Sequence, residues 1–190
     1  MEELENSLKK YFLFLGKHCL LWESAAKKAS KSLCAIENLA DQLQSASSTG
    51  PDVPINIQFP DLKQQIIYKT LLSLEQELIP IMSVIKEISE ATDNLNKLST
   101  MIYKHDVNNF AFDTVSLRVL LESVHDTRQY YQAQYAGLQT ALRCLDFRDS
   151  NSIFNLRKCL IEDKDLKRHA ERCLLFGKYF LSAMNAEEIF

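Results

Sequence analysis

The sequence predicts an all-α protein: an elongated antiparallel bundle of three long coiled-coil-like helices, followed by one or two short C-terminal helices. Three observations lead to this fold class. Apolar residues recur every three or four positions over three long stretches. Gly and Pro number only four each among 190 residues. Three of the four prolines fall between the first two stretches. We expect residues 1–190 to form a single helical-bundle domain.

The first helix is predicted over residues 3–47 and carries the longest apolar stripe. Its members alternate spacings of four and three, the period of helices that supercoil around one another: Leu8, Phe12, Leu15, Cys19, Trp22, Ala26, Ala29, Leu33, Ile36, Ala40 and Leu43. At 1.5 Å per residue this helix would be about 65 Å long. The remaining chain is expected to cover its stripe.

A linker is predicted at residues 48–60, because it combines Gly50 with three prolines. Its alternating apolar residues would also permit a short extended piece: Val53, Ile55, Ile57 and Phe59. The second helix is expected over residues 61–104, with this stripe: Ile67, Leu71, Leu74, Leu78, Ile81, Ile85, Ile88, Thr92, Leu95, Ser99 and Ile102. Pro80 lacks a backbone N–H, so we expect a kink near Glu77 rather than a helix end.

The third long helix is predicted over residues 115–147, after a turn at 104–114. Its stripe has the same period: Leu117, Leu121, Val124, Arg128, Tyr131, Tyr135, Leu138, Leu142 and Leu145. Arg128 either extends its charged end into solvent along its methylene stem, which we favour, or pairs with an acid across the interface. Two short helices are expected at about 151–161 and 165–184, separated from the third by the capping residues Asp149–Asn151.

Composition excludes several classes of protein. The net charge of −3 and pI of about 5.8 argue against a strong, non-specific nucleic-acid binder. We also expect no direct sequence-specific nucleic-acid partner. No apolar run is long enough to span a membrane, and the start MEELENSLKK is acidic, unlike a signal peptide. Five cysteines without CxxC spacing indicate reduced thiols in the cytosol or nucleus.

No catalytic constellation stands out. The four histidines lie on different predicted elements, without metal-binding spacing. His18 and Cys19 are adjacent, and neighbouring helical residues point about 100° apart, so they do not make a nucleophile and base. The acidic run Glu162, Asp163 and Asp165 is more typical of a helix start than of a cation site. We therefore predict no catalytic residues, no metal and no cofactor.

Aromatic residues are the better candidates for partner binding. Trp22 lies in the first stripe, where core packing is favoured over a role as an interface anchor. Tyr131 and Tyr135 lie in the third stripe, with their hydroxyls expected at its rim. Tyr130 is expected to face elsewhere and to be more available to a partner.

Four motifs resemble one known family. They are LW-x-SA at Leu21–Ala25, NLA-x-QLQ at Asn38–Gln44, FPDLK at Phe59–Lys63, and Tyr131 with Tyr135 after Asp126. Their order and separation resemble the AIRIM family of ribosome-maturation factors over about the first three-quarters of the chain. The resemblance implies a non-catalytic adaptor that pairs with a helical protein like cyclin-dependent-kinase-2-interacting protein. That pair would work with a type II AAA ATPase of the spermatogenesis-associated class in cytoplasmic maturation of the large ribosomal subunit, with a possible link to chromatin and the replisome.

The resemblance and the aromatic pattern together select eight partner-binding candidates: Trp22, Phe59, Pro60, Asp61, Leu62, Tyr130, Tyr131 and Tyr135. The pre-ribosomal particle would be an indirect partner, membranes would not be partners, and the location would be cytoplasmic and nuclear. Two alternatives remain open. One is a tether or SNARE-like bundle in membrane traffic. The other is a small enzyme or metal-binding helical domain.

Overall fold

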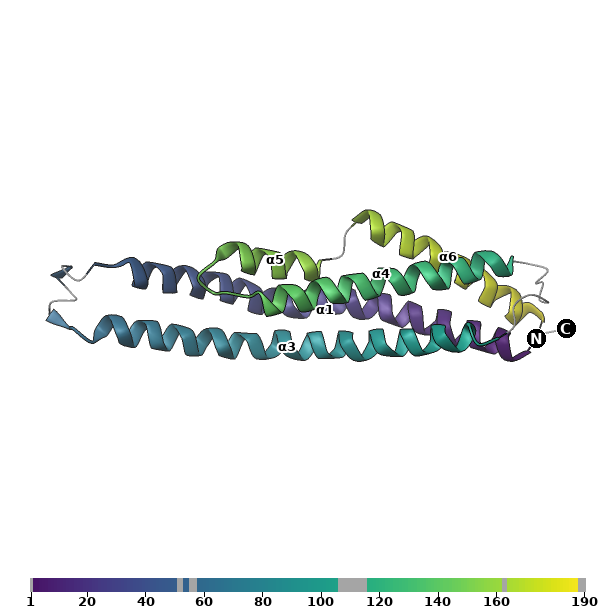
Figure 1. Cartoon of the computed structure of the whole chain (residues 1–190), viewed down its shortest axis with the longest axis horizontal. Coiled ribbons are helices and arrows are strands. Elements are labelled where there is room, and N and C mark those ends of the chain that lie inside the picture. Colours follow the sequence, from purple (N-terminus) through teal and green to yellow (C-terminus); the bar gives the residue numbers. More distant parts are fainter. Residues whose placement is uncertain (1, 51–52, 55–57, 106–115, 162–163, 188–190) are drawn as a thin grey trace. The chain divides into compact units, whose positions relative to one another are not determined.

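The structure is a computed structural model that describes residues 2–50, 53–54, 58–105, 116–161 and 164–187. Over these residues the chain is an all-α helical bundle, as predicted (Figure 1). The helices in chain order are α1 (Glu2–Ser48), α3 (Leu62–Ile102), α4 (Leu117–Arg143), α5 (Ser150–Leu160) and α6 (Lys164–Glu187). The predicted turn at 104–114 and the apolar residues Ile55 and Ile57 lie largely or wholly outside the described residues.

The chain groups into two compact units. Unit 1 comprises Met1–Glu23, Glu87–Gly137 and Glu162–Phe190, and unit 2 comprises Ser24–Lys86 and Leu138–Ile161. Helices α1, α3 and α4 therefore each contribute residues to both units. The apolar stripes gave no sign of this division, because they continue without interruption through the boundaries.

Unit 1 combines the first half of α1 with the second half of α3, most of α4, and α6. Its core is built from apolar side chains of all four helices. Ser7 of α1 lies 3.4 Å from His105, which directly follows α3, so the two helices run in opposite directions within this unit. The main apolar core residues of unit 1 are Leu4, Leu8, Phe12, Leu15, Trp22, Ile88, Leu95, Ile102, Val124, Tyr131, Ala170 and Phe180.

Unit 2 combines the second half of α1 with the first half of α3, the end of α4, and α5. Its buried apolar residues include Ala29, Leu33, Ile36, Leu43, Leu74, Ile81, Leu138, Ile153, Leu156 and Leu160. The Lys63 ammonium donates to the carbonyl of Ser47 at 3.1 Å, which holds the start of α3 beside the end of α1. Arg157 of α5 pairs with Glu37 of α1 at 2.9 Å.

The predicted stripe of the first helix is confirmed, and that of the second is confirmed in part, because its first members Ile67 and Leu71 are half-buried. Every member of the α1 stripe is buried except Cys19 and Ala26, which are half-buried. From Leu74 onward, every member of the α3 stripe is buried except Leu78. Helix α3 continues through Pro80, whose side chain is exposed, so the proline does not end the helix.

The predicted stripe of the third helix is partly wrong. Leu121, Tyr135, Leu142 and Leu145 are only half-buried, and so is Arg128. Buried positions of α4 that the stripe omitted are Leu120, Ser123, Thr127, Tyr130 and Ala141. The hydroxyls among them satisfy their hydrogen bonds locally: Ser123 Oγ donates to the Val119 carbonyl at 2.8 Å, and Thr127 Oγ1 donates to the Ser123 carbonyl at 2.6 Å. A pattern read from apolar residues alone misses such positions.

Several helix boundaries also differ from the prediction. Helix α4 ends at Arg143, earlier than the predicted 147, and a short turn follows. Asp149 then caps α5, its carboxylate accepting from the Asn151 N–H at 3.0 Å, as the capping signal indicated. Helix α6 has 24 residues, so it is not the short helix that was expected.

The described helices include none that combines the length and the apolar character needed to cross a membrane. The five cysteines are all free thiols in this structure.

Candidate functional site

A buried aromatic cluster in unit 1 contains three of the residues selected from the sequence. Trp22 is 1% exposed and stacks on Tyr131 with ring centroids 6.1 Å apart. Tyr131 also packs edge-on against His18 at 4.4 Å and against Tyr130 at 4.7 Å. The preference for Trp22 as a core residue is confirmed. Trp22 and Tyr131 are both almost completely buried, so neither has enough exposed surface to contact a partner in this structure.

The expectation that Tyr130 faces away from the core is wrong, because its side chain is only 8% exposed. The Tyr130 ring is in edge contact with the ring of Tyr131. The position of Tyr130 on the helix does not by itself predict this contact. Tyr135 is half-buried, and its hydroxyl donates to Ser89 Oγ at 2.7 Å. The Tyr131 hydroxyl donates to Cys19 Sγ at 3.1 Å.

His18 is the polar centre of the aromatic cluster. Its Nε2 accepts a hydrogen bond from the Trp22 indole N–H at 3.2 Å, so the proton of the neutral ring is on Nδ1. Nδ1 has no hydrogen-bond partner among the described residues. Burial lowers the pKa of His18 to about 4. The imidazole is therefore neutral at physiological pH.

The second group of selected residues lies at the start of α3 in unit 2, apart from the aromatic cluster. Phe59 is 52% exposed, Pro60 and Asp61 are exposed, and Leu62 is half-buried. The Leu62 N–H donates to the Phe59 carbonyl at 3.1 Å, and the Gln65 N–H donates to the Asp61 carbonyl at 3.0 Å, so this segment is an ordered helix start. We call residues 59–62 the α3 corner. Of the eight candidates, only Phe59, Pro60 and Asp61 of the α3 corner are exposed.

Two exposed apolar features of unit 1 were missed. The first is a groove of about 440 Å³ between α1 and α6, lined by Leu13, Gly16 and Leu20 of α1 together with Ala170 and Leu174 of α6. Leu13 and Leu20 are 53% and 66% exposed. They lie seven residues apart and outside the predicted stripe, which is the sequence signal that would have found them.

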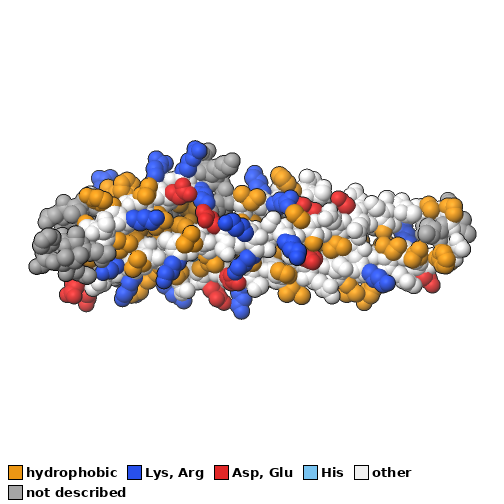
Figure 2. Space-filling model, turned by 180° about the vertical axis from the view of Figure 1, so that it is seen from behind, with side chains coloured by type: hydrophobic (Ala, Val, Ile, Leu, Met, Phe, Trp, Pro, Cys, Tyr) orange, Lys and Arg blue, Asp and Glu red, His pale blue; other side chains and the backbone are white. Residues whose placement is uncertain are grey.

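The second missed feature is a row of exposed apolar residues on α6, which we call the α6 outer row: Leu175, Phe176 and Tyr179. The side chains of all three are between 46% and 61% exposed. In the space-filling view, hydrophobic side chains are interspersed with Lys, Arg and acidic side chains (Figure 2). Mixed surfaces of this kind are typical of non-obligate protein interfaces.

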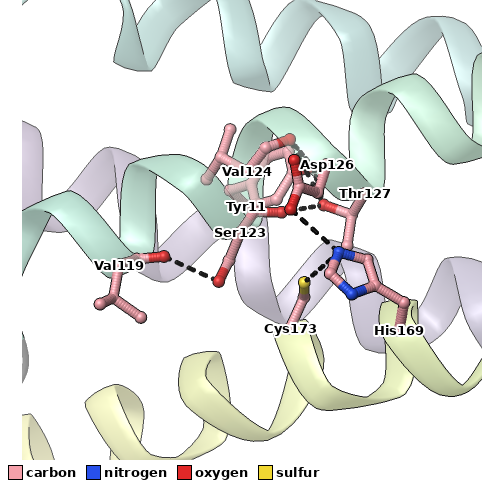
Figure 3. A network of polar contacts seen from close by, with 8 residues as sticks. All are labelled: Tyr11, Val119, Ser123, Val124, Asp126, Thr127, His169 and Cys173. Atoms are coloured by element: carbon pink, nitrogen blue, oxygen red, sulfur yellow. Dashed lines mark hydrogen bonds and ion pairs between the residues drawn. The ribbon is translucent and has the colours of Figure 1, made fainter.

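A polar network joins α1, α4 and α6 in unit 1 (Figure 3). The Tyr11 hydroxyl donates to the Val124 carbonyl at 3.1 Å and lies 2.7 Å from Thr127 Oγ1. Next to it, His169 Nε2 lies 2.9 Å from Asp126 Oδ2 and 3.9 Å from Cys173 Sγ. Burial raises the pKa of the Cys173 thiol and of the Tyr11 hydroxyl.

The acidic run that was weighed as a cation site cannot be compared with this network, because its side chains are not among those that the structure describes. Glu162 and Asp163 lie outside the described residues, and so does the side chain of Asp165. Within the network, Asp126 lies 43 residues before His169 in the sequence, and Cys173 follows His169 by four residues. Only the folded chain brings Asp126 to them.

Comparison with known families decides which group the chain falls into. The sequence model of the family described as "Ribosome biogenesis protein C1orf109-like" matches residues 2–169, well over half of the 190 residues. The chain belongs to this C1orf109-like family. Helices α1 to α5 and the start of α6 lie within the matched range.

Two members with curated names are similar to this chain. The AFG2-interacting ribosome maturation factor of Homo sapiens is 25% identical over 167 residues, which cover 82% of this chain and 82% of the human protein. The protein of the same name from Mus musculus is 26% identical over 167 residues, covering 82% of this chain and 77% of the mouse protein. The resemblance to the AIRIM family is thereby confirmed.

The C1orf109-like match includes the α3 corner and the aromatic cluster, and it ends at His169. Cys173 and the α6 outer row lie beyond it. The names of the relatives describe a maturation factor that interacts with AFG2, not an enzyme.

Proposed function

We propose that this chain is a non-catalytic adaptor of an AFG2-type AAA ATPase in cytoplasmic maturation of the large ribosomal subunit. The observation that carries the proposal is membership of the C1orf109-like ribosome biogenesis family, together with the names of its human and mouse relatives. The energy for remodelling would come from the ATPase, and this chain would supply binding surfaces. The pre-ribosomal particle would then be an indirect partner.

The proposal extends to a heterodimer with a helical protein like cyclin-dependent-kinase-2-interacting protein, and to a cytoplasmic and nuclear location with a second role at chromatin and the replisome. Exposed apolar side chains in both units support a binding function. Phe59 in unit 2 and the α6 outer row in unit 1 expose large apolar areas that an interface would bury. Trp22, Tyr130 and Tyr131 would serve the heterodimer only indirectly, by maintaining the shape of unit 1.

The test is affinity purification of the tagged chain from its own cells, at moderate salt, with ATP or a non-hydrolysable analogue, followed by mass spectrometry. We expect an AAA ATPase of the spermatogenesis-associated class and a second small helical protein. Recovery of vesicle-tethering proteins without an ATPase would instead favour the membrane-traffic alternative. Recovery of the chain alone would refute the adaptor role.

Surface variants locate the interface within the same experiment. Phe59→Ser in the α3 corner and Tyr179→Ser in the α6 outer row each remove one exposed ring. Ile79→Ser is the matched control, because Ile79 is 67% exposed and lies outside both surfaces. We expect at least one of the first two to reduce recovery of a partner about tenfold or more, a loss of about 1.4 kcal/mol, while the control retains it. Equal recovery with all three variants would exclude both surfaces.

A further inference from the structure

We propose that Asp126, His169 and Cys173 form a zinc-binding site that joins α4 to α6 within unit 1. One ligand atom from each of the three residues lies within 4.8 Å of the other two. Asp126 comes from α4, and the other two come from one face of α6, since positions four apart in a helix lie side by side. This inference does not depend on the adaptor function, and it departs from the expectation that the chain holds no metal.

The three ligand atoms converge on one point. His169 Nε2 is the atom nearest to both other groups, at 2.9 Å from Asp126 Oδ2 and 3.9 Å from Cys173 Sγ (Figure 3). In a tetrahedral zinc site with Zn–N near 2.0 Å, Zn–O near 2.0 Å and Zn–S near 2.3 Å, the corresponding separations are about 3.3 Å and about 3.6 Å. The two observed separations from His169 Nε2 differ from these by only a few tenths of an ångström. The third separation, between the Asp126 carboxylate and Cys173 Sγ, lies within 4.8 Å, and ion binding would bring these two atoms closer together. Small side-chain rotations would admit the ion.

The same geometry argues against a Cys-His-Asp catalytic triad. In a triad the acid holds one ring nitrogen of the histidine while the other nitrogen receives the proton of the nucleophile. Here the carboxylate and the thiol both approach Nε2. One nitrogen cannot serve both partners in that mechanism. A metal ion between the three groups would instead be bound by Nε2, a carboxylate oxygen and Sγ, one bond from each.

The donor types select the metal. A thiolate, an imidazole and a carboxylate together match the nitrogen, sulfur and oxygen ligands that Zn²⁺ takes, whereas Mg²⁺ and Ca²⁺ prefer oxygen ligands alone. On binding, the Cys173 S–H would lose its proton to solvent, and the sulfur would donate an electron pair to the ion.

The site is open on one side. The side chains of His169 and Asp126 are 47% and 40% exposed, while Cys173 is buried at 4% exposure. An ion would therefore enter from solvent and keep a water molecule as its fourth ligand. Two ligands from α6 and one from α4 would fix the last helix on the bundle.

The experiment is titration of the purified full chain with Co²⁺, which replaces zinc and reports a sulfur ligand through a thiolate-to-cobalt charge-transfer band. Competition with Zn²⁺ and metal analysis of the protein then give the stoichiometry. We expect one metal per chain, a charge-transfer band that Zn²⁺ abolishes, and loss of that band in Cys173→Ser. Asp126→Asn and His169→Gln should each weaken metal binding at least tenfold.

Two control variants remove the same residue types elsewhere. Cys144→Ser removes an exposed thiol, and His125→Gln removes an exposed histidine directly beside Asp126. Both should bind Co²⁺ as the wild type does. Circular dichroism of each variant verifies that the helices remain folded, and Asp126→Asn preserves the side-chain size at a half-exposed position. A charge-transfer band that survives in Cys173→Ser, or binding that Cys144→Ser abolishes, would overturn the proposal, as would absence of any band in the wild type.

Discussion

Gly177 of α6 lies directly against the Phe12 ring of α1, so closely that a methyl group added to Gly177 would overlap the ring. Phe12 has no room to move away, because its side chain is 1% exposed and packs against Tyr11 and Phe180. The absence of a side chain at position 177 is therefore what allows α6 to approach α1 in unit 1.

Gly177→Ala should lower the free energy of unfolding by about 1–2 kcal/mol, because the strain of overpacking exceeds the gain in helix propensity. Gly16→Ala is the control: its added methyl would meet Leu174 Cδ1 at an ordinary 3.9 Å. That variant should gain about 0.5–1 kcal/mol. Urea unfolding of both variants measures the difference. If Gly177→Ala were as stable as Gly16→Ala, the close approach of α6 to α1 would be refuted.

Trp22→Ala should destabilise the chain by about 3–5 kcal/mol, since it removes the largest buried side chain of the aromatic cluster. Leu20→Ala, at a 66% exposed position of the same helix, should change stability by less than about 0.5 kcal/mol. Denaturant unfolding compares the two. An unchanged melting curve together with lost partner binding would show that Trp22 is an interface anchor instead.

Protonation of His18 should destabilise the fold at acid pH. Its pKa is about 4 in the folded state and 6.5 in the unfolded state, so the unfolded chain binds more protons below pH 6.5. The contribution of neutral His18 to the free energy of unfolding is therefore fully present above pH 6.5. It decreases as the pH falls from 6.5 to 4, and below pH 4 this residue causes no further loss. The full difference is about 3 kcal/mol.

The measurement is the free energy of unfolding between pH 4 and 7, for the wild type and for His18→Gln. The variant should lack about 3 kcal/mol of the wild-type decline, because it has no imidazole to protonate beside the Trp22 indole. His125→Gln removes an exposed histidine and should follow the wild-type curve. Parallel curves for wild type and His18→Gln would show that the His18 ring is not buried as described.

Pro80→Ala should stabilise the chain by about 1–3 kcal/mol. Pro80 lies inside α3 with an exposed side chain, and alanine would restore the missing backbone N–H to the helix. Thermal unfolding of Pro80→Ala, with Ile79→Ala as a neighbouring control, measures the effect. A lower unfolding temperature for Pro80→Ala would mean that the packing of unit 2 requires the backbone shape that the proline imposes.

Sequence periodicity located most of the buried face of α1 and α3, because most members of each stripe are apolar. It was insufficient for α4, because the polar residues Ser123 and Thr127 are buried there. Each of them donates its hydroxyl hydrogen to a backbone carbonyl of the same helix. The edge contact between Tyr130 and Tyr131 was missed for a related reason, since helical phase does not describe how two neighbouring rings pack.

The candidate sites were less predictable than the helices. The α3 corner could be identified from the FPDLK motif, because proline and turn residues are typical of exposed chain segments before a helix. Asp126 lies near His169 and Cys173 because α4 packs beside α6. An apolar stripe in the sequence does not predict which helix will pack against it. The groove between α1 and α6 had a weak signal in Leu13 and Leu20, two exposed apolar residues one heptad apart.

The interleaving of the two units has a consequence for the order in which the chain is made. Unit 2 uses only residues 24–86 and 138–161, so all of it has been synthesised once Ile161 has left the ribosome. Unit 1 also needs residues 162–190, which are made after residue 161. During translation, residues 87–137 can cover part of the early α1 stripe, whereas Phe12, which packs against Gly177 and Phe180, lacks these neighbours until α6 emerges.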